Sequence, residues 1–380
     1  MPQKIKALNN GRNPEFSVLS VFAIIFTVMG HAGVTFPTME WLFPFDSFHM
    51  PLFVFISGYF FRYQSVSLHS TKKFLQKLVG RLLIPFFLWN LAYGIFTLVL
   101  SAIAGVPAFQ PDEFLYILLV RPFVYGNCFF IFNDPSWFIL ALFEVKLFHW
   151  LLRLLFSKVK RKEIIITVLS LMLAVGAVTA ARIAVRTPLV ITITRALYLH
   201  LWFQVGILYR QFGEKHDNMN TVLYITLVFL SQLLLWLIVG DKGINAYIYN
   251  SEFVNCAGLT ILAALNGIAF FLRIAKIVSR SIGNNKTVDY ISRHTFSIMM
   301  HHILGFMVLK TLFWGIDSAL HINEFNLNSF LTDMWYYYLP RGLSCFRMLY
   351  VLVGLFLPLC GCKLWDKIRS HMSLHNLATK

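Results

Sequence analysis

Long apolar stretches separated by short polar breaks run along almost the whole chain. About ten of them approach the ~20 residues that a helix needs to cross ~30 Å of hydrocarbon. The breaks are rich in charge, as at residues 157–163 and 210–217. The stretches are centred near residues 26, 55, 93, 145, 172, 199, 229, 263, 302 and 351. The pattern predicts an all-α, polytopic bundle of about ten transmembrane helices, without internal repeats.

Composition supports a membrane protein. Hydrophobic residues make up 58% of the 380 residues and charged residues only 13%, with a mean hydropathy of +0.66. Soluble globular chains carry about 25% charged residues. This composition therefore excludes disorder, a collagen-like repeat and a disulfide scaffold, and it argues strongly against a soluble enzyme. The five cysteines form no Cys-x-x-Cys pair and give no zinc signature.

The distribution of basic residues predicts the orientation. The net charge is +16, which in a soluble protein would suggest nucleic acid. With the N-terminus inside, however, the inner segments hold 24 Lys and Arg against five outside. Cytoplasmic loops collect such residues, so we expect both termini in the cytoplasm, contact with membrane lipid, and no nucleic acid. The expected parts are a tail at 1–15, a transmembrane domain at 16–362 and a tail at 363–380, in a multi-pass protein of the cell membrane.

One inner segment combines four bases in a basic amphipathic stretch that leads into the third span. These bases are Lys72, Lys73, Lys77 and Arg81. Two interpretations remain open: the bases set topology and attract anionic lipid, or they also bind the phosphates of an anionic cosubstrate.

A polar stripe on the first span indicates a functional face. Ser20, Thr27 and His31 are separated by seven and four residues, which places them on one side of a helix. Lipid would reject this stripe, so it must face the bundle interior or a cavity. His31 is either a satisfied structural group or a base, because the histidine pKa lies near working pH.

Other polar residues in the spans are also costly to bury and are therefore functional candidates. Glu144 and Lys146 are two residues apart, so each needs its own partner. Ser57 and Gly58 form a small-residue notch suited to close helix packing. The remaining candidates are His49, Trp137, Arg195 and the neighbouring His301 and His302.

Two classes of function remain open at this point, a membrane enzyme and a transporter. The chain has no His-Glu-x-x-His, phosphate-binding glycine loop or carboxylate dyad, so we expect no metal. An exporter of a glycan or small molecule stays as an alternative, since Glu144, Lys146 and Arg195 could line a path. The chain has no paired, glycine- or proline-broken spans of the kind that mark transporter repeats.

Several segments together resemble the membrane-bound acyltransferase family 3, particularly its branch of fucose 4-O-acetylase-like enzymes. The similarity extends over nearly the whole chain. The span-one histidine together with the Phe-His-Met-Pro and Ser-Gly block is its most specific part. The segments are Val-Met-Gly-His (28–31), Phe-His-Met-Pro-Leu-Phe-Val-Phe-Ile-Ser-Gly-Tyr-Phe (48–60), Arg-Leu-Leu-Ile-Pro-Phe (81–86), Pro-Ser-Trp-Phe-Ile-Leu-Ala-Leu-Phe (135–143) and Thr-Phe-Ser-Ile-Met-Met-His-His (295–302).

The resemblance implies an integral membrane O-acyltransferase. Acetyl-CoA or a related acyl-CoA would be a cytoplasmic cosubstrate, with no bound cofactor. A hydroxyl of a surface polysaccharide or lipid-linked glycan would be the acceptor. His31 matches the catalytic histidine, which would remove the acceptor proton or briefly carry the acyl group. His49 and His302 match further recurrent histidines, Arg81 a recurrent basic position, and Trp137 a recurrent Trp-Phe.

The chain departs from the family at one place. Members usually have Arg or Lys eleven residues before the span-one histidine, often with an acidic residue slightly earlier. Here these positions are Ser20 and Ser17. Either Arg62 or Arg81 supplies the missing charge, or the donor site is altered, or the chain is an inactive member.

Overall fold

The computed structural model describes residues 13–34, 40–62, 67–125 and 130–378, with side chains as far as His371. Most of the expected N-terminal tail, residues 1–12, lies outside this part. The described chain is almost entirely helical, which confirms the predicted all-α polytopic bundle. A two-stranded antiparallel ribbon pairs Ala246 with Phe253 and Tyr247 with Glu252.

The helices follow the apolar stretches of the sequence. Their bounds are α1 (Pro14–His31), α2 (His49–Tyr59), α3 (Leu68–Leu78), α4 (Ile84–Ala104), α5 (Arg121–Val124), α6 (Trp137–Leu155), α7 (Lys162–Ile183), α8 (Pro188–Leu208), α9 (Glu214–His216), α10 (Thr221–Val239), α11 (Ala257–Ile282), α12 (Lys286–Arg293), α13 (Thr295–Ala319), α14 (Leu327–Thr332) and α15 (Arg347–Ala378). The strands are β1 (Ala246–Tyr247) and β2 (Glu252–Phe253).

Eight helical segments in the described chain are long and apolar enough to cross a membrane. The expected span near residue 145 is α6, which has 19 residues and three charged side chains. The expected span near residue 55 is α2, which has only 11 residues. At 1.5 Å per residue, α2 covers about 16 Å, roughly half of the hydrocarbon core. Hydropathy overestimated its length because the chain turns through a short 3₁₀ helix at Phe45–Ser47 before α2 begins.

Local chemistry fixes the ends of α1, which positions the first candidate histidine. The side chain of Asn13 accepts a hydrogen bond from the backbone N–H of Glu15, and Pro14 occupies the first turn. Both features are typical of helix starts. The helix ends just before Gly33, whose φ of 62° lies in the left-handed region that glycine adopts without strain. His31 is therefore the last residue of the helix.

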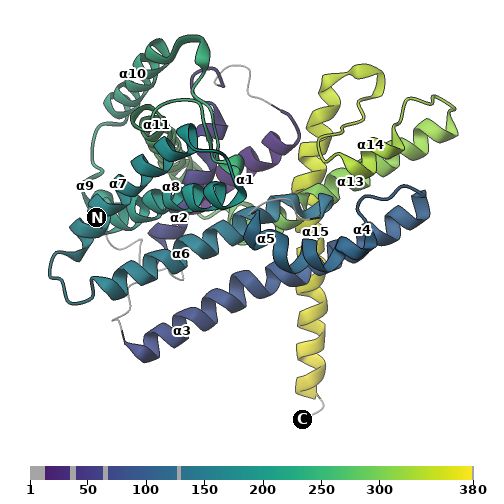
Figure 1. Ribbon diagram of the computed structural model, residues 1–380, viewed down its shortest axis with the longest axis horizontal. Coiled ribbons are helices and arrows are strands. Elements are labelled where there is room, and N and C mark those ends of the chain that lie inside the picture. Colours follow the sequence, from purple (N-terminus) through teal and green to yellow (C-terminus); the bar gives the residue numbers. More distant parts are fainter. Residues whose placement is uncertain (1–12, 35–39, 63–66, 126–129, 379–380) are drawn as a thin grey trace.

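The bundle is built around close helix contacts. Figure 1 shows α3 and α4 continuing one another alongside α6, while the C-terminal part of α15 extends away from the other helices. Helices α2 and α8 touch backbone to backbone. A Cβ on Gly58 would overlap the carbonyl oxygen of Phe203, and a Cβ on Gly206 would overlap that of Phe55. The predicted Ser57-Gly58 notch is thus a helix-packing site, and Gly58 provides the close approach.

Three of the segments that the charge pattern assigns to the inside, residues 1–15, 210–217 and 273–293, contact one another or the start of α1. Asn13 Nδ2 lies 3.5 Å from Glu214 Oε1, and Ser17 Oγ donates to Asp289 Oδ1 at 3.2 Å. Asp217 pairs with Lys276 Nζ at 2.9 Å and with Arg273. These segments therefore lie at one end of the bundle, as a common cytoplasmic side requires.

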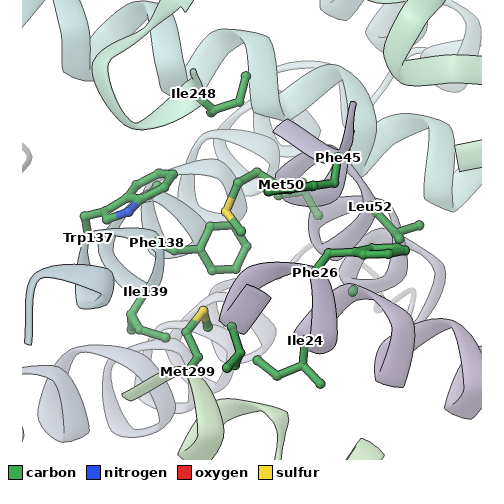
Figure 2. Packing of buried hydrophobic residues seen from close by; sticks show 14 of the residues in the cluster. Ile24, Phe26, Phe45, Met50, Leu52, Trp137, Phe138, Ile139, Ile248 and Met299 are labelled. Carbon is green, nitrogen blue, oxygen red and sulfur yellow. The ribbon is translucent and has the colours of Figure 1, made fainter. Parts of the chain in front are cut away.

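The core near the centre of the bundle joins helices that are distant in sequence. In Figure 2, Met50 of α2 and Met299 of α13 approach Phe138 of α6 from opposite sides, and Ile24 and Phe26 of α1 lie close by. All five side chains are buried. Flexible methionines fill such irregular gaps. This packing brings the ends of α1, α2 and α6 together around one cavity, beside α13.

Candidate active site

A cavity of about 400 Å³ opens among the ends of α1, α2 and α6, the 3₁₀ segment before α2, and the loop around β1. Its lining combines apolar and aromatic side chains with a few polar groups, as small-molecule sites do. Of the three histidines predicted as catalytic candidates, His31 and His49 line it together, whereas His302 does not; Trp137 lines it as well. The polar wall also includes Thr27, Asp46, Asp134 and Tyr249.

His31 and His302 form a directed pair. Nδ1 of His302 lies 3.0 Å from the carbonyl oxygen of Ile298, which can only accept, so this nitrogen carries the proton. In neutral His302, Nε2 is then an acceptor. Nδ1 of His31 lies 2.8 Å from that Nε2 and donates to it. The lone pair of His31 is consequently on Nε2, and His31 lines the cavity.

The turn that follows His31 is held from α15. Arg347 Nη1 donates to the carbonyl oxygen of Ala32 at 3.0 Å. The Arg347 guanidinium lies where a Cβ on Gly33 would be, so residue 33 must be glycine both for its φ and for this contact. The ring of Tyr337 lies against the guanidinium, with 5.4 Å between its centroid and Cζ of Arg347. Arg347 thereby fixes the end of α1 that carries His31.

His49 presents a second basic nitrogen to the cavity. Its Nδ1 donates to the carbonyl oxygen of Phe45 at 2.8 Å, which leaves the lone pair on Nε2. Asp46 lies in the 3₁₀ segment one turn earlier and lines the same cavity. Burial raises the pKa of the Asp46 carboxyl to about 6, so it retains its proton closer to neutrality than an exposed aspartate does.

Arg195 supports the wall of the cavity without lining it. Its side chain is fully buried in α8, and its Cζ lies 4.9 Å from the ring centroid of Trp137. Its Nη1 donates to the carbonyl oxygen of Tyr249 at 3.2 Å, and the Tyr249 hydroxyl donates to Asp134 at 3.1 Å. One buried guanidinium therefore orients an indole, a loop carbonyl and, through Tyr249, a carboxylate of the wall.

Not all of the predicted site residues lie at the cavity that His31 lines. The bases Lys72, Lys73, Lys77 and Arg81 are exposed along α3 and the π-helical segment Val79–Leu83, and none lines the histidine cavity. Ser57 does not line it either. Ser20 is buried and donates to the carbonyl oxygen of Phe16 at 2.7 Å. Ser20, where the resemblance leads one to expect a basic residue, therefore supplies no charge and bonds within its own helix turn.

Among the residues of the cavity wall that sequence reasoning missed are Asp46, Asp134, Tyr249 and Trp335. All four lie outside the long helices, on segments that hydropathy treats as connections. Asp46 could have been noticed three residues before His49, and Asp134 three residues before Trp137. Tyr249 and Trp335 gave no comparable signal, because only the folded chain brings them to the other residues.

Among the residues that the structure describes, no group of three or more His, Cys, Asp or Glu side chains is arranged to hold a metal ion. In the comparison with protein families, the family model described as an acyltransferase domain matches residues 13–362. No curated protein and no solved structure matches the chain.

Proposed function

We infer the reaction from the family: the chain belongs to the membrane-bound acyltransferase family 3 and is a multi-pass membrane acyltransferase. We propose that it moves an acetyl group from cytoplasmic acetyl-CoA to a hydroxyl of a surface polysaccharide or lipid-linked glycan. The observation that carries the proposal is the chain of hydrogen bonds Ile298–His302–His31, which leaves the lone pair on Nε2 of His31, a residue that lines the cavity. Family membership favours this enzyme over the alternative of an exporter. The cell membrane is the proposed location.

In the proposed reaction, Nε2 of His31 takes the proton of the acceptor hydroxyl. The hydroxyl oxygen attacks the thioester carbonyl, a new C–O ester bond forms, and the C–S bond breaks. The CoA thiolate then takes the proton from the His31 imidazolium. A general base of this kind contributes about 10²–10⁴ in rate. Protons and bonds balance without another reactant.

His302 has a positioning role in this scheme. It is fully buried and acts on the reactants only through His31. Its acceptor nitrogen selects the tautomer of His31 and steadies the imidazolium when His31 is protonated, as the buried partner of a catalytic histidine does elsewhere. His49 offers a second acceptor nitrogen, which suits a hydrogen bond from a neighbouring acceptor hydroxyl.

For the donor, we propose that the exposed bases Lys72, Lys73, Lys77 and Arg81 bind the phosphates of CoA. They lie on the continuous stretch from α3 into α4 and are open to solvent. Phosphate oxygens accept strong, charge-assisted hydrogen bonds from such groups. The acyl end of the donor would then enter the bundle toward the cavity of His31.

A direct assay tests the function. Membranes that contain the protein, supplied with acetyl-CoA radiolabelled in the acetyl group and with glycan from the cell surface, should form alkali-labile label on the glycan. The CoA thiol should appear in equal amount, because one ester forms for each thioester broken. Thiol release without labelled glycan would mean thioester hydrolysis, and no release at all would contradict an acyl-CoA donor.

Charge reversal tests the donor site. Changing Lys72, Lys73, Lys77 and Arg81 together to glutamate should raise the KM for acetyl-CoA about tenfold at low salt, since each exposed ion pair contributes roughly 0.2–1 kcal/mol. The kcat should remain close to that of the wild type. Rising salt should reduce the difference, because exposed charges are screened.

The matched control reverses three exposed bases of another predicted inner loop, Lys158, Lys160 and Arg161. It should leave the KM unchanged. Insertion of both variants is checked with a cysteine added after Lys380, which an impermeant thiol reagent should reach only in opened membranes. An unchanged KM in correctly inserted Lys72–Arg81 variants would restrict those bases to topology and lipid contact.

A further inference from the structure

A second cavity, of about 310 Å³, adjoins the histidine cavity. The two share Asp134, Tyr249 and Trp335 in their linings. Beyond this common wall, the second cavity is lined by Arg121, Asp333 and Thr97, with apolar and aromatic side chains between them. A molecule that fills it therefore lies directly beside the space that His31 faces.

The charges of this cavity match an acceptor better than the donor. Its charged lining residues are two carboxylates, Asp134 and Asp333, and one guanidinium, that of Arg121. Carboxylates repel the phosphates of CoA but accept hydrogen bonds from hydroxyl groups, and a guanidinium donates to hydroxyl oxygens. Such a balance suits an uncharged molecule with several hydroxyls.

Trp335 is placed between the two cavities. Its side chain is 54% exposed, and its ring centroid lies 5.7 Å from that of His31. A flat, exposed aromatic face is the surface on which a sugar ring buries its C–H face while its hydroxyls remain at the edge. A ring resting on Trp335 would direct edge hydroxyls toward His31 on one side and toward the second cavity on the other.

The loop that carries Trp335 is held by its own hydrogen bonds. The backbone N–H of Trp335 donates to Asp333 Oδ1 at 2.8 Å. The hydroxyl of Tyr336 accepts from the backbone N–H of Asn326 at 2.9 Å, and that of Tyr338 donates to Asp317 at 3.2 Å. The exposed indole is therefore presented by a fixed loop, which reduces the entropy lost on binding.

We propose that the second cavity is the acceptor subsite: a polyhydroxylated sugar ring stacks on Trp335, bonds its hydroxyls to Asp333, Asp134 and Arg121, and places one further hydroxyl at His31. This inference rests on the proposed acyl transfer to a glycan, but its binding step does not require turnover. Trp335 and Asp333 then determine which acceptor is used, while His31 performs the proton transfer.

Saturation-transfer NMR on the full chain in nanodiscs tests binding apart from chemistry. The probes are methyl α-D-mannopyranoside, methyl β-D-galactopyranoside and methyl α-L-fucopyranoside. At least one should receive saturation from the wild type. Trp335→Ala should weaken that binding roughly tenfold, as expected for loss of an aromatic contact, and Trp335→Phe should restore most of it. Asp333→Asn should weaken it as well.

Two controls separate the test of the acceptor subsite from the test of acyl transfer. Trp41→Ala removes an indole of similar exposure, 50%, that lines neither cavity, and should bind the probe normally. His31→Gln should also bind the probe while losing transfer. The subsite is wrong if no glycoside binds the wild type, or if Trp335→Ala and Asp333→Asn bind like Trp41→Ala. Normal probe binding without acetyl transfer by the wild type would instead count against the proposed function.

Discussion

Replacing His31 by glutamine should reduce acyl transfer at least a hundredfold and leave the fold intact. The glutamine amide can still donate to Nε2 of His302, so the 2.8 Å contact has a substitute. It cannot accept a proton at neutral pH, and loss of a general base costs about 10²–10⁴ in rate, roughly 3–5 kcal/mol of barrier. The measurements are acetyl incorporation into glycan and the melting temperature in detergent.

Variants of His302 and His301 serve as controls, because we expect them to reduce acyl transfer to different extents. His302→Leu removes the acceptor that fixes the tautomer of His31, whereas His302→Gln can still accept from it and should recover part of the rate. The pH–rate profile should shift in His302→Leu, because the basicity of His31 depends on its partner. His301 faces Tyr93 instead, with its Nδ1 2.8 Å from the hydroxyl, so His301→Gln should be mild. Near-normal transfer by His31→Gln would make this histidine structural and refute the mechanism.

Substituting Gly58 should cause the largest loss of stability. A Cβ there meets the backbone of Phe203 in α8, which cannot rotate away as a side chain can. Overpacking costs typically 1–3 kcal/mol, and occasionally more. We expect Gly58→Ala to lower the free energy of unfolding by about 3 kcal/mol or more, and Gly58→Val to prevent accumulation of folded protein. Thermal unfolding in detergent and the yield of monodisperse protein measure this.

Gly176 provides the matched control. It also lies inside a helix, α7, but a Cβ there meets no atom within 4 Å. Gly176→Ala should therefore be neutral or stabilise by up to about 1 kcal/mol, since alanine favours helix more than glycine does. Gly206→Ala, on the opposite side of the α2–α8 contact, should resemble Gly58→Ala. Equal melting temperatures for the Gly58 and Gly176 variants would show that α2 and α8 can separate at little cost.

Much of the fold could be predicted, because long apolar stretches indicate membrane helices and small-residue notches indicate where such helices pack closely. The stripe of Thr27 and His31 was correctly expected to face the interior, and both residues line the cavity. Gly58 was correctly placed at a close helix contact. Hydropathy failed at α2, because the apolar residues before it, including Phe43 and Phe48, are buried in a turn rather than in a membrane-spanning helix.

The site itself was only partly accessible from the sequence. His31 and His302 are 271 residues apart, and no spacing along the chain predicts their hydrogen bond. The resemblance marked both as recurrent histidines but did not predict their contact. Arg195 was recognised as a costly buried group, but its partners, the Trp137 ring and the Tyr249 carbonyl, depend on how α6, α8 and the β1 region pack. Side chains on connections, such as Trp335, carry no periodic signal.

The shortness of α2 has a consequence for how far the reactants must travel. Its C-terminal residue, Tyr59, is tied to the predicted cytoplasmic end by Asn13 and by Arg210, at 2.8 and 3.1 Å. Its first residue, His49, lines the reaction cavity. Along α2 the two are only about 15 Å apart. The protein is thus thin at this point, and in the proposed reaction an acyl group would cross only about half a bilayer to meet an acceptor from the other side.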